Sequence, residues 1–397
     1  MSFVHYGWLL SPYSAKTRSM MHYKAVPFYD VAPSGLQLYY TLIKPAVGRP
    51  IMPTVMTPEG TWLQDSALIC DAIEARFVTP STTPAGPTQR LASELLELWA
   101  DEWFSLLTLH YRWNVPDNKQ WAVGEFARKA FPWLPEFLSR KLAAPVAESM
   151  QRYRPIVGIT EATQPGIDAF TVELIAALEV HFSAGHQFLL GDRPCRGDFA
   201  LSAPLWAHLY RDPHTRYLFD GAPACRGWLD RLQGAAGHQQ EDRVPGDSTV
   251  PPGSSLGGGS PRPAGEWLPN DIVPASLDPV FHSLFRDMGP FLSLVTDAVD
   301  AYLADHPDAK RVPRVLGDGK FTIGGAQGTR KIQAFTHWKA QRAFDVCTGA
   351  SEEWLSRVGG LETMRRCPHR RLRRVGVQEQ VLSQEELQPV PLVRAKL

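Results

Sequence analysis

A short turn near the amino terminus carries the residues best suited to chemistry. Residues 10–18 read LSPYSAKTR, which places the hydroxyls of Ser11 and Ser14 where an apolar segment gives way to helical spacing. A helix start presents free backbone N–H groups and a positive dipole, so a thiol held against it ionises more readily. A serine hydroxyl could donate a hydrogen bond to such a thiolate. The alternative is that Ser11 or Ser14 only caps the helix, because serine is a preferred cap residue.

Two further segments have the residue types that an extended peptide ligand requires. Pro53 lies at the start of a predicted strand, and a cis bond before it would turn the backbone at Met52 outward to pair with such a ligand. Asp65 and Ser66 open the next helical pattern, directly after Gln64. There the carboxylate could bind an ammonium, and the hydroxyl with backbone N–H groups could bind a carboxylate. Capping alone is the other interpretation of this pair.

Residues 1–80 predict the strands and helices that would position these side chains. Apolar segments at 3–9, 26–31, 51–56 and 61–63 fit strands, and the apolar spacing at 14–23 and 66–77 fits helices. A turn at residues 57–60, TPEG, separates the last two strands. The order is strand, helix, strand, then two strands and a helix, which predicts an α/β unit.

The three motifs together resemble the glutathione S-transferase superfamily over residues 3–77. The shared pattern is a strand, a serine turn with basic residues at the helix start, a proline before a strand, and an acid-serine pair opening a helix. The turn is most similar to the serine-type classes such as tau and zeta. The resemblance implies a thioredoxin-like domain that binds glutathione as a co-substrate.

The resemblance also implies a role for each matching residue. Ser11 takes the position of the serine that activates the glutathione sulfur, with Ser14 as the second choice. The backbone of Met52, before Pro53, would pair with the cysteinyl part of glutathione. The acid-serine pair would hold the γ-glutamyl end. The remaining predicted glutathione-binding residues are therefore Gln64, Asp65 and Ser66.

Residues 88–232 predict an all-helical bundle, because the apolar spacing is helical and strand signals are few. The segment FLLGDRPCRGDFAL, residues 188–201, resembles a superfamily segment in which serine and aspartate form a helix capping box. Cys195 replaces that serine and should weaken the box, and Asp198 is expected to be structural. Tyr111 and Trp113 lie on the helices that wall the hydrophobic substrate cleft in this superfamily. Packing in the bundle core is the alternative for both.

The rest of the chain is not explained by the resemblance, since a typical family chain would end near residue 232. Residues 234–264 are rich in glycine, proline and serine and predict a disordered insertion. Residues 265–397 predict a mostly helical C-terminal extension, with helices at 277–305 and 338–347, a hairpin around 320–335 and an irregular basic tail from about 365. The extension could cover the helical domain or block its usual dimer face.

Composition and charge exclude several classes of protein. Lysine plus arginine and aspartate plus glutamate each number 41, so no net charge draws the chain to nucleic acid or an anionic membrane. No apolar run approaches the roughly 20 residues needed to cross a bilayer. Five cysteines without a CxxC pair suit a reducing compartment, and the cytoplasm is expected. The histidines lack metal-binding spacing, so no metal is predicted.

The predicted function is a glutathione transferase, in which the glutathione thiolate attacks a small hydrophobic electrophile held by the helical domain. The expected partners are glutathione and that electrophile, with a homodimer or a protein assembly as further partners, and neither nucleic acid nor membrane. The alternative is a non-catalytic scaffold, or a subunit of a larger assembly, that uses the same fold.

Overall fold

The amino-terminal part of the chain is a thioredoxin-like α/β domain, which confirms the predicted fold class. The computed structural model describes residues 2–32, 39–131, 133–234, 265–366, 370–374 and 382–384. The four strands of the first sheet are β1 (Phe3–Tyr6), β2 (Phe28–Val31), β3 (Thr54–Met56) and β4 (Trp62–Gln64). They are arranged in the order β2-β1-β3-β4. Strand β1 is parallel to β2 and antiparallel to β3, and β3 is antiparallel to β4.

Helices α1 (Pro12–Tyr23) and α4 (Ser66–Arg76) begin at the two serine motifs. Ser11 is in extended conformation, its Oγ accepts a hydrogen bond from the Ser14 N–H at 3.2 Å, and Pro12 occupies the first turn. Between β2 and β3 lie the π-helical turn η1 (Tyr39–Ile43) and the short helix α3 (Lys44–Val47). The predicted ends of these elements differ from the observed ends by a few residues, as is usual at frayed termini.

A buried ion pair holds α1 against the sheet. His5 of β1 lies 2.8 Å from the Asp30 carboxylate of β2, and the Arg18 Nε of α1 donates to the same carboxylate at 2.5 Å. Burial disfavours the charged carboxylate, but Arg18 and His5 outweigh that effect and hold the pKa of Asp30 far below its usual value. The direction in which α1 leaves the sheet, and therefore the position of Ser11, depends on this contact.

The second part of the chain, as predicted, is helical. Its longer helices are α5 (Pro87–Glu102), α6 (Ser105–Trp113), α7 (Pro116–Ala130), α8 (Glu136–Gln151), α10 (Gln164–Ser183), α11 (Arg196–Pro204) and α12 (Pro223–Leu229). Short turns are α9 (Arg154–Val157), η2 (Leu205–Tyr210), η3 (Arg216–Phe219) and η4 (Asp230–Gly234). The capping box of α11 forms despite Cys195, because the Asp198 carboxylate accepts from the Cys195 N–H at 2.8 Å.

The C-terminal extension begins with the turns η5 (Pro269–Asp271) and η6 (Ala275–Leu277). The remaining elements are α14 (Asp278–Asp287), α15 (Gly289–Asp305), β5 (Val315–Ile323), β6 (Ala326–Gln333), α16 (Ala334–Val346), α17 (Glu352–Arg357), α18 (Leu361–Arg365), β7 (Leu372–Arg374) and β8 (Leu382–Gln384). Strands β5 and β6 form the predicted antiparallel hairpin.

Two expectations for the extension were wrong in detail. The single helix over 277–305 is two helices, α14 and α15, which meet at Met288. Pro290 accounts for the break, because it lacks an N–H and its ring clashes with the preceding turn of a continuous helix. The basic tail is not wholly irregular, since β7 and β8 pair antiparallel within it.

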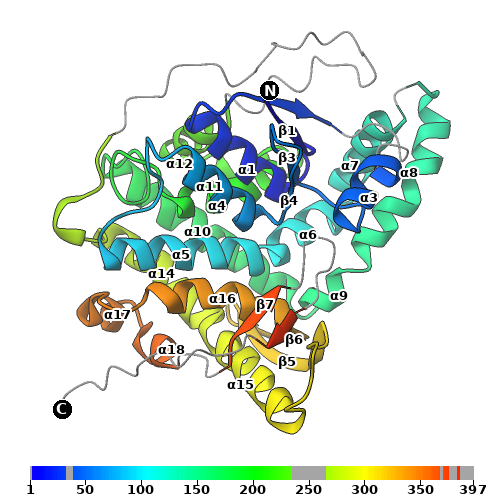
Figure 1. Cartoon of the computed structure of the whole chain (residues 1–397). Helices are drawn as coiled ribbons and strands as arrows, with labels where there is room; N and C mark the ends of the chain where they lie inside the picture. The colour runs from blue at the N-terminus through cyan, green and yellow to red at the C-terminus, as the bar shows by residue number, and fades with distance from the viewer. Residues whose placement is uncertain are drawn as a thin grey trace.

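The three parts of the chain share a hydrophobic core. One buried cluster contains Phe28 of β2, Trp99 of α5 and Phe281 of α14. Figure 1 shows the extension lying along α5, on the opposite side from the first sheet. The predicted divisions at 1–80, 88–232 and 265–397 remain predictions, and most of the predicted insertion, 235–264, lies outside the described residues. Immediately after it, Leu268 donates its N–H to the Leu190 carbonyl at 2.9 Å.

Candidate functional site

A cavity of about 930 Å³ lies where the three parts of the chain meet. It is bounded by the start of α1, the junction of β4 and α4, the helices α5 to α8, and the extension. Its lining includes Trp8, Ser11, Tyr13, Lys16, Met52, Pro53, Gln64, Asp65, Ser66, Asp101, Arg112, Trp113, Phe126, Met150, Tyr153, His208, Arg314, Arg330, Phe335 and Lys339. Seven of the nine residues predicted from the sequence to form the site line this cavity, and two, Ser14 and Tyr111, do not.

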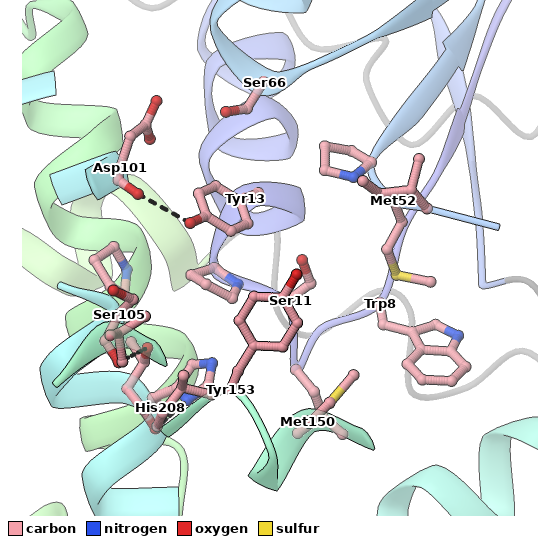
Figure 2. A pocket seen from close by; sticks show the side chains of 18 of the residues that line it. Trp8, Ser11, Tyr13, Met52, Ser66, Asp101, Ser105, Met150, Tyr153 and His208 are labelled. Carbon is pink, nitrogen blue, oxygen red and sulfur yellow. Dashed lines mark hydrogen bonds between the residues drawn. The ribbon is translucent and has the colours of Figure 1, made fainter. Parts of the chain in front are cut away.

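Ser11 faces the cavity while it caps α1. Its Oγ accepts the Ser14 N–H at 3.2 Å, which leaves the hydroxyl proton free to donate, and no acceptor for that proton is found in the described part of the chain. Figure 2 shows Ser11 near the middle of the cavity, between Ser66 and Met150 in this view. Helix capping and ligand binding by Ser11 are therefore compatible. The cap uses a lone pair of the hydroxyl oxygen, and a ligand would accept the hydroxyl proton.

Ser14 lies one turn further along α1, inside the protein. Its side chain is buried, and its hydroxyl oxygen has no hydrogen-bond partner among the described residues. It packs so closely on Gly7 that a Cβ there would be 2.7 Å from the Ser14 oxygen. This position separates Ser14 from any ligand in the cavity.

The turn that carries Ser11 is fixed from the helical side by Arg112 of α6. Its Nη1 donates to the Leu10 carbonyl at 2.8 Å, and its Nη2 donates to the Asp212 carboxylate at 2.6 Å. His208 lies beside it, with Nε2 at 3.1 Å from Arg112 Nη1. Burial and the Arg112 charge hold the pKa of His208 well below its usual value, so its imidazole is neutral and accepts from Arg112.

Tyr13 is the nearest phenol to Ser11 in the sequence, and its hydroxyl is already engaged. It donates to the Asp101 backbone carbonyl at 2.9 Å. Burial and the Asp101 charge raise the pKa of Tyr13, so the phenol stays protonated. A tyrosine with its proton committed to a carbonyl is a poor donor to a thiolate, which leaves Ser11 as the hydroxyl available at this helix start.

Met52 and Pro53 line the cavity on the side opposite α5, and the peptide bond between them is cis. In Figure 2 the Met52 side chain points into the same space as Ser11 and Trp8.

Asp65 caps α4 and has an unusual backbone conformation. Its Oδ1 accepts the N–H of Ala67 at 2.9 Å and that of Leu68 at 3.4 Å. Its φ is 84°, in a region that non-glycine residues rarely adopt and that costs on the order of 1–3 kcal/mol. The residue is therefore held in place by its surroundings, with its carboxylate at the edge of the cavity and Ser66 beside it.

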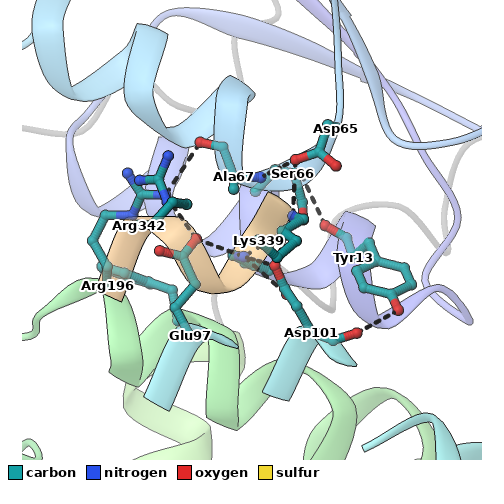
Figure 3. A network of polar contacts seen from close by, with 12 residues as sticks. Tyr13, Asp65, Ser66, Ala67, Glu97, Asp101, Arg196, Lys339 and Arg342 are labelled. Carbon is teal, nitrogen blue, oxygen red and sulfur yellow. Dashed lines mark hydrogen bonds and ion pairs between the residues drawn. The ribbon is translucent and has the colours of Figure 1, made fainter. Parts of the chain in front are cut away.

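A lysine from the extension meets that carboxylate. Lys339 of α16 is 5% exposed, and its ammonium lies 3.0 Å from Asp65 and 3.2 Å from Asp101 (Figure 3). Burial favours the neutral carboxyl, but the Lys339 ammonium outweighs it and holds the pKa of Asp65 below its usual value. Burial likewise favours a neutral Lys339, but the two carboxylates outweigh it and raise the pKa of that ammonium. The contact is a buried ion pair with both members charged.

The ion pairs continue away from the cavity as a buried chain. Lys16 of α1 bonds Glu97 at 2.7 Å and Asp101 at 2.8 Å, and Arg196 of α11 bonds Glu97 at 2.7 Å. Arg196 also meets Asp71 of α4, which Arg342 of α16 bonds at 2.7 Å. The chain of charges, drawn in Figure 3, joins the amino-terminal domain, the helices and the extension.

Gln64 is also engaged by the extension. Arg374 of β7 donates to its backbone carbonyl at 3.1 Å and to its side-chain oxygen. Two of the predicted glutathione-binding residues, Gln64 and Asp65, therefore already contact cations of this chain.

The helical wall of the cavity is aromatic and apolar. Trp113 lines it and stacks on Phe126, with ring centroids 6.2 Å apart and planes 9° apart. Tyr153 also lines the cavity, and its hydroxyl accepts a hydrogen bond from Arg314 of the extension at 2.6 Å. Tyr111 is instead buried in the main core cluster, which was the alternative given for it. Because the extension closes one side of this wall, the cavity belongs to the whole chain.

Lys339 and Arg374 were not among the residues predicted from the sequence. A lysine at the start of a predicted helix and an arginine in a basic tail are ordinary surface residues by pattern. The one available signal was the clustering of buried-type acids, Glu97 and Asp101, at helical spacing on α5, which need cations from elsewhere in the chain.

No cysteine among the described residues lines this cavity. Cys70 is buried inside α4, and burial raises the pKa of its thiol to about 12. Within the described ranges no cluster of histidine, cysteine, aspartate or glutamate is arranged to hold a metal ion. No helix in the described part of the chain is long and apolar enough to cross a membrane.

Comparison with known proteins places the first domain in a family. Residues 6–81 match the glutathione S-transferase N-terminal domain. This domain therefore belongs to the glutathione S-transferase N-terminal domain family, as the motifs predicted.

Three solved structures are among those similar to the chain. A GST-like protein from Pseudomonas syringae is 24% identical over 59% of this chain and 67% of its own, with a TM-score of 0.36. A beta-etherase from Sphingobium sp. is 20% identical over 62% of this chain and 100% of its own, with a TM-score of 0.42. A glutathione S-transferase from Methylobacterium radiotolerans, in complex with glutathione sulfonate, is 16% identical over 62% and 100%, with a TM-score of 0.38.

Proposed function

We propose that the protein is a glutathione transferase that uses Ser11 to activate the glutathione thiol for attack on a hydrophobic electrophile. The observation that carries the proposal is that the Ser11 hydroxyl, the Asp65–Ser66 start of α4 and the aromatic wall at Trp113 all line one cavity. A hydroxyl donor, a site for a charged peptide end and an apolar wall are the three features that this reaction requires.

In this proposal the thiol of glutathione lies against the start of α1. The Ser11 hydroxyl donates to the sulfur, and the positive end of the α1 dipole adds to the effect, so the thiolate form is stabilised. The thiolate then forms a carbon–sulfur bond with the electrophile, and the leaving group departs with the electron pair of the broken bond. Arg112, through the Leu10 carbonyl, keeps the Ser11 turn in position.

The peptide part of glutathione would lie along the cavity edge formed by β3 and α4. By the family resemblance, the Met52 backbone pairs with the cysteinyl residue, and Asp65 with Ser66 holds the γ-glutamyl end. Gln64 would contribute its amide nitrogen, because its oxygens accept from Arg374. The electrophile would pack on Trp113 and its neighbours, where an apolar molecule loses contact with water.

A calorimetric titration of glutathione tests the proposal, with a conjugation assay on a generic aryl halide run on the same samples. We expect saturable binding to the wild-type chain, loss of that binding in the double variant Asp65→Ala/Ser66→Ala, and slower turnover in Ser11→Ala. Absence of binding to the wild type would remove the enzymatic proposal.

The second candidate is a non-catalytic scaffold or assembly subunit, and one observation favours it. Asp65 and Gln64 already contact Lys339 and Arg374, so the cavity edge is stabilised without a ligand. In that case the chain would fold and remain intact with no affinity for glutathione. The same titration separates the two candidates. For either, the scattered thiols suit the cytoplasm as the proposed location.

A further inference from the structure

The two oxygens of the Asp65 carboxylate have different surroundings. Oδ1 accepts from the N–H groups of Ala67 and Leu68 and from the Lys339 ammonium at 3.0 Å. Oδ2 has no hydrogen-bond partner within the described residues, and it is not fully buried. An open carboxylate oxygen at the cavity edge remains available to a ligand cation even though Lys339 is bound to its neighbour.

The two lysines at this end of the cavity also differ in how many hydrogen-bond partners their ammonium groups have. Lys16 Nζ contacts Glu97 at 2.7 Å, both oxygens of Asp101 at 2.8 and 2.9 Å, and the Ser66 hydroxyl at 3.5 Å. Lys339 Nζ contacts one oxygen of Asp65 and one of Asp101. An ammonium has three N–H groups, so Lys339 keeps one donor beyond its two carboxylate contacts.

An α-amino acid group presents an ammonium and a carboxylate on one carbon atom. The start of α4 offers an open oxygen of Asp65 for the first charge, and the Ser66 hydroxyl with the Lys339 ammonium for the second. Resting on the proposed function, we propose that Lys339 is a specificity-determining residue that binds the α-carboxylate of the γ-glutamyl group. The extension then completes the binding site, because α16 supplies an ammonium with a spare donor, whereas the Lys16 ammonium of α1 is engaged by Glu97 and Asp101.

The opposite arrangement makes a different prediction. If Lys339 took the place of the ligand ammonium on Asp65, its removal would free the carboxylate and glutathione would bind more tightly. If Lys339 binds the ligand carboxylate, its removal weakens binding, and only for ligands that have that carboxylate. Two analogues separate these cases: 4-aminobutyryl-cysteinylglycine lacks the α-carboxylate, and glutaryl-cysteinylglycine lacks the α-ammonium.

The experiment is a calorimetric titration of glutathione and the two analogues into the full-length wild type, Lys339→Met, Lys339→Arg and Arg342→Met. Arg342 is the matched control, because it lies on α16 three residues after Lys339, forms ion pairs with Asp71 and Glu94, and does not line the cavity. Unfolding transitions of every variant, measured on the same samples, show that each one is folded. Lys339→Arg keeps the charge, so it should keep most of the difference in affinity between glutathione and the analogue without the α-carboxylate.

In the wild type we expect the analogue without the carboxylate to bind about tenfold to a hundredfold more weakly than glutathione, as for loss of a hydrogen bond between charged groups. In Lys339→Met the ratio of the affinity for glutathione to that for the analogue without the carboxylate should shrink by about tenfold or more. The analogue without the ammonium should still bind more weakly than glutathione. Arg342→Met should keep the wild-type preference.

Two results would overturn the inference while the proposed function stands. One is tighter or unchanged glutathione binding in Lys339→Met, and the other is an unchanged preference for the carboxylate. Failure of the wild type and of every variant to bind any of the three peptides would instead defeat the proposed function, and this inference with it.

Discussion

At the level of single residues, the proposed catalysis depends on one hydroxyl group that can accept one hydrogen bond and donate another. Ser11 accepts a hydrogen bond as a helix cap and still has a proton to donate into the cavity. Ser14, three residues later, has a hydroxyl of the same chemistry that is buried and has no hydrogen-bond partner among the described residues. Substitutions of Ser11 and Ser14 can therefore be compared directly, because the two residues have the same side chain in different surroundings.

Ser11→Ala should lower the rate of thiol conjugation by about tenfold to a hundredfold, since a hydrogen bond to a charged group contributes about 1.5–3 kcal/mol. It should also lower the free energy of unfolding by about 1 kcal/mol through loss of the cap. Steady-state kinetics and denaturant unfolding measure the two effects. Ser14→Ala is the control, with unchanged turnover and equal or higher stability. The reverse pattern would transfer the role to Ser14.

A second residue-scale prediction concerns pH and the buried pair of Asp65 and Lys339. The folded pKa of Asp65 is lowered below its unfolded value of about 4, so the pair stabilises the fold above that pH and less as the pH falls through the folded pKa. In Lys339→Met, burial of Asp65 loses its largest offset, and only the weaker attractions of Lys16 and Arg374 remain. We expect a loss of about 3–5 kcal/mol in the free energy of unfolding at neutral pH, as for other broken buried pairs.

That loss should shrink as the pH falls from about 4, where Asp65 of the unfolded chain becomes protonated, through the lower folded pKa of Asp65 in the wild type. Urea unfolding at a series of pH values, with the variant and wild type side by side, provides the measurement. A difference between them that is independent of pH would show that Asp65 and Lys339 are not coupled.

At the scale of elements, the hairpin of the extension is seated on α10 by backbone contact. A Cβ on Gly166, in the first turn of α10, would lie 2.1 Å from the Ile323 carbonyl oxygen. A Cβ on Gly324, at the hairpin tip, would lie 2.1 Å from the Gly166 carbonyl oxygen, and Gly324 has a φ of 51°. Only glycine allows the two backbones to approach so closely.

Gly166→Ala should therefore lower the free energy of unfolding by about 1–3 kcal/mol, because the added methyl group meets backbone that must shift. Gly227→Ala inside α12 is the control, since its nearest neighbour is the end of the Arg231 side chain at 3.4 Å. There the better helix propensity of alanine should leave stability equal or up to about 1 kcal/mol higher. Equal effects of the two substitutions in thermal unfolding would argue against this seating of the hairpin.

Local patterns predicted most of these elements, and long-range contacts account for what they missed. The βαβ start, the helical middle and the β5–β6 hairpin follow from apolar spacing and turn residues over a few positions. Asp65 and Ser66 could be assigned to a helix start for the same reason. The Asp65–Lys339 contact spans 274 residues, and its formation depends on how α16 packs on α4 and α5. The local sequence around Asp65 or around Lys339 therefore does not identify the other residue as its partner.

At the scale of the whole molecule, the extension is part of the folded unit. Its residues belong to the main hydrophobic cluster, and Lys339 and Arg342 neutralise carboxylates of α4 and α5. Its removal would expose that apolar surface and leave Asp65, Asp71 and Asp101 with fewer cations, and a buried carboxylate without its partner is costly.

A chain truncated after residue 264 should therefore lose cooperative unfolding, bind a hydrophobic dye, and fail to bind glutathione. Denaturant unfolding followed by near-ultraviolet circular dichroism, and dye fluorescence, measure these properties. A truncated chain that unfolds cooperatively and binds glutathione like the intact protein would show that the extension is a separate unit.

In the proposed function, this chain binds glutathione and lowers the pKa of its thiol through Ser11. The most direct measurement is a pH titration of the thiolate absorbance of glutathione bound to the wild type and to Ser11→Ala. The account predicts a midpoint below that of free glutathione in the wild type, and a rise of about one to two pH units in the variant. A bound thiol that titrates like the free peptide, or at the same midpoint in both proteins, would contradict it.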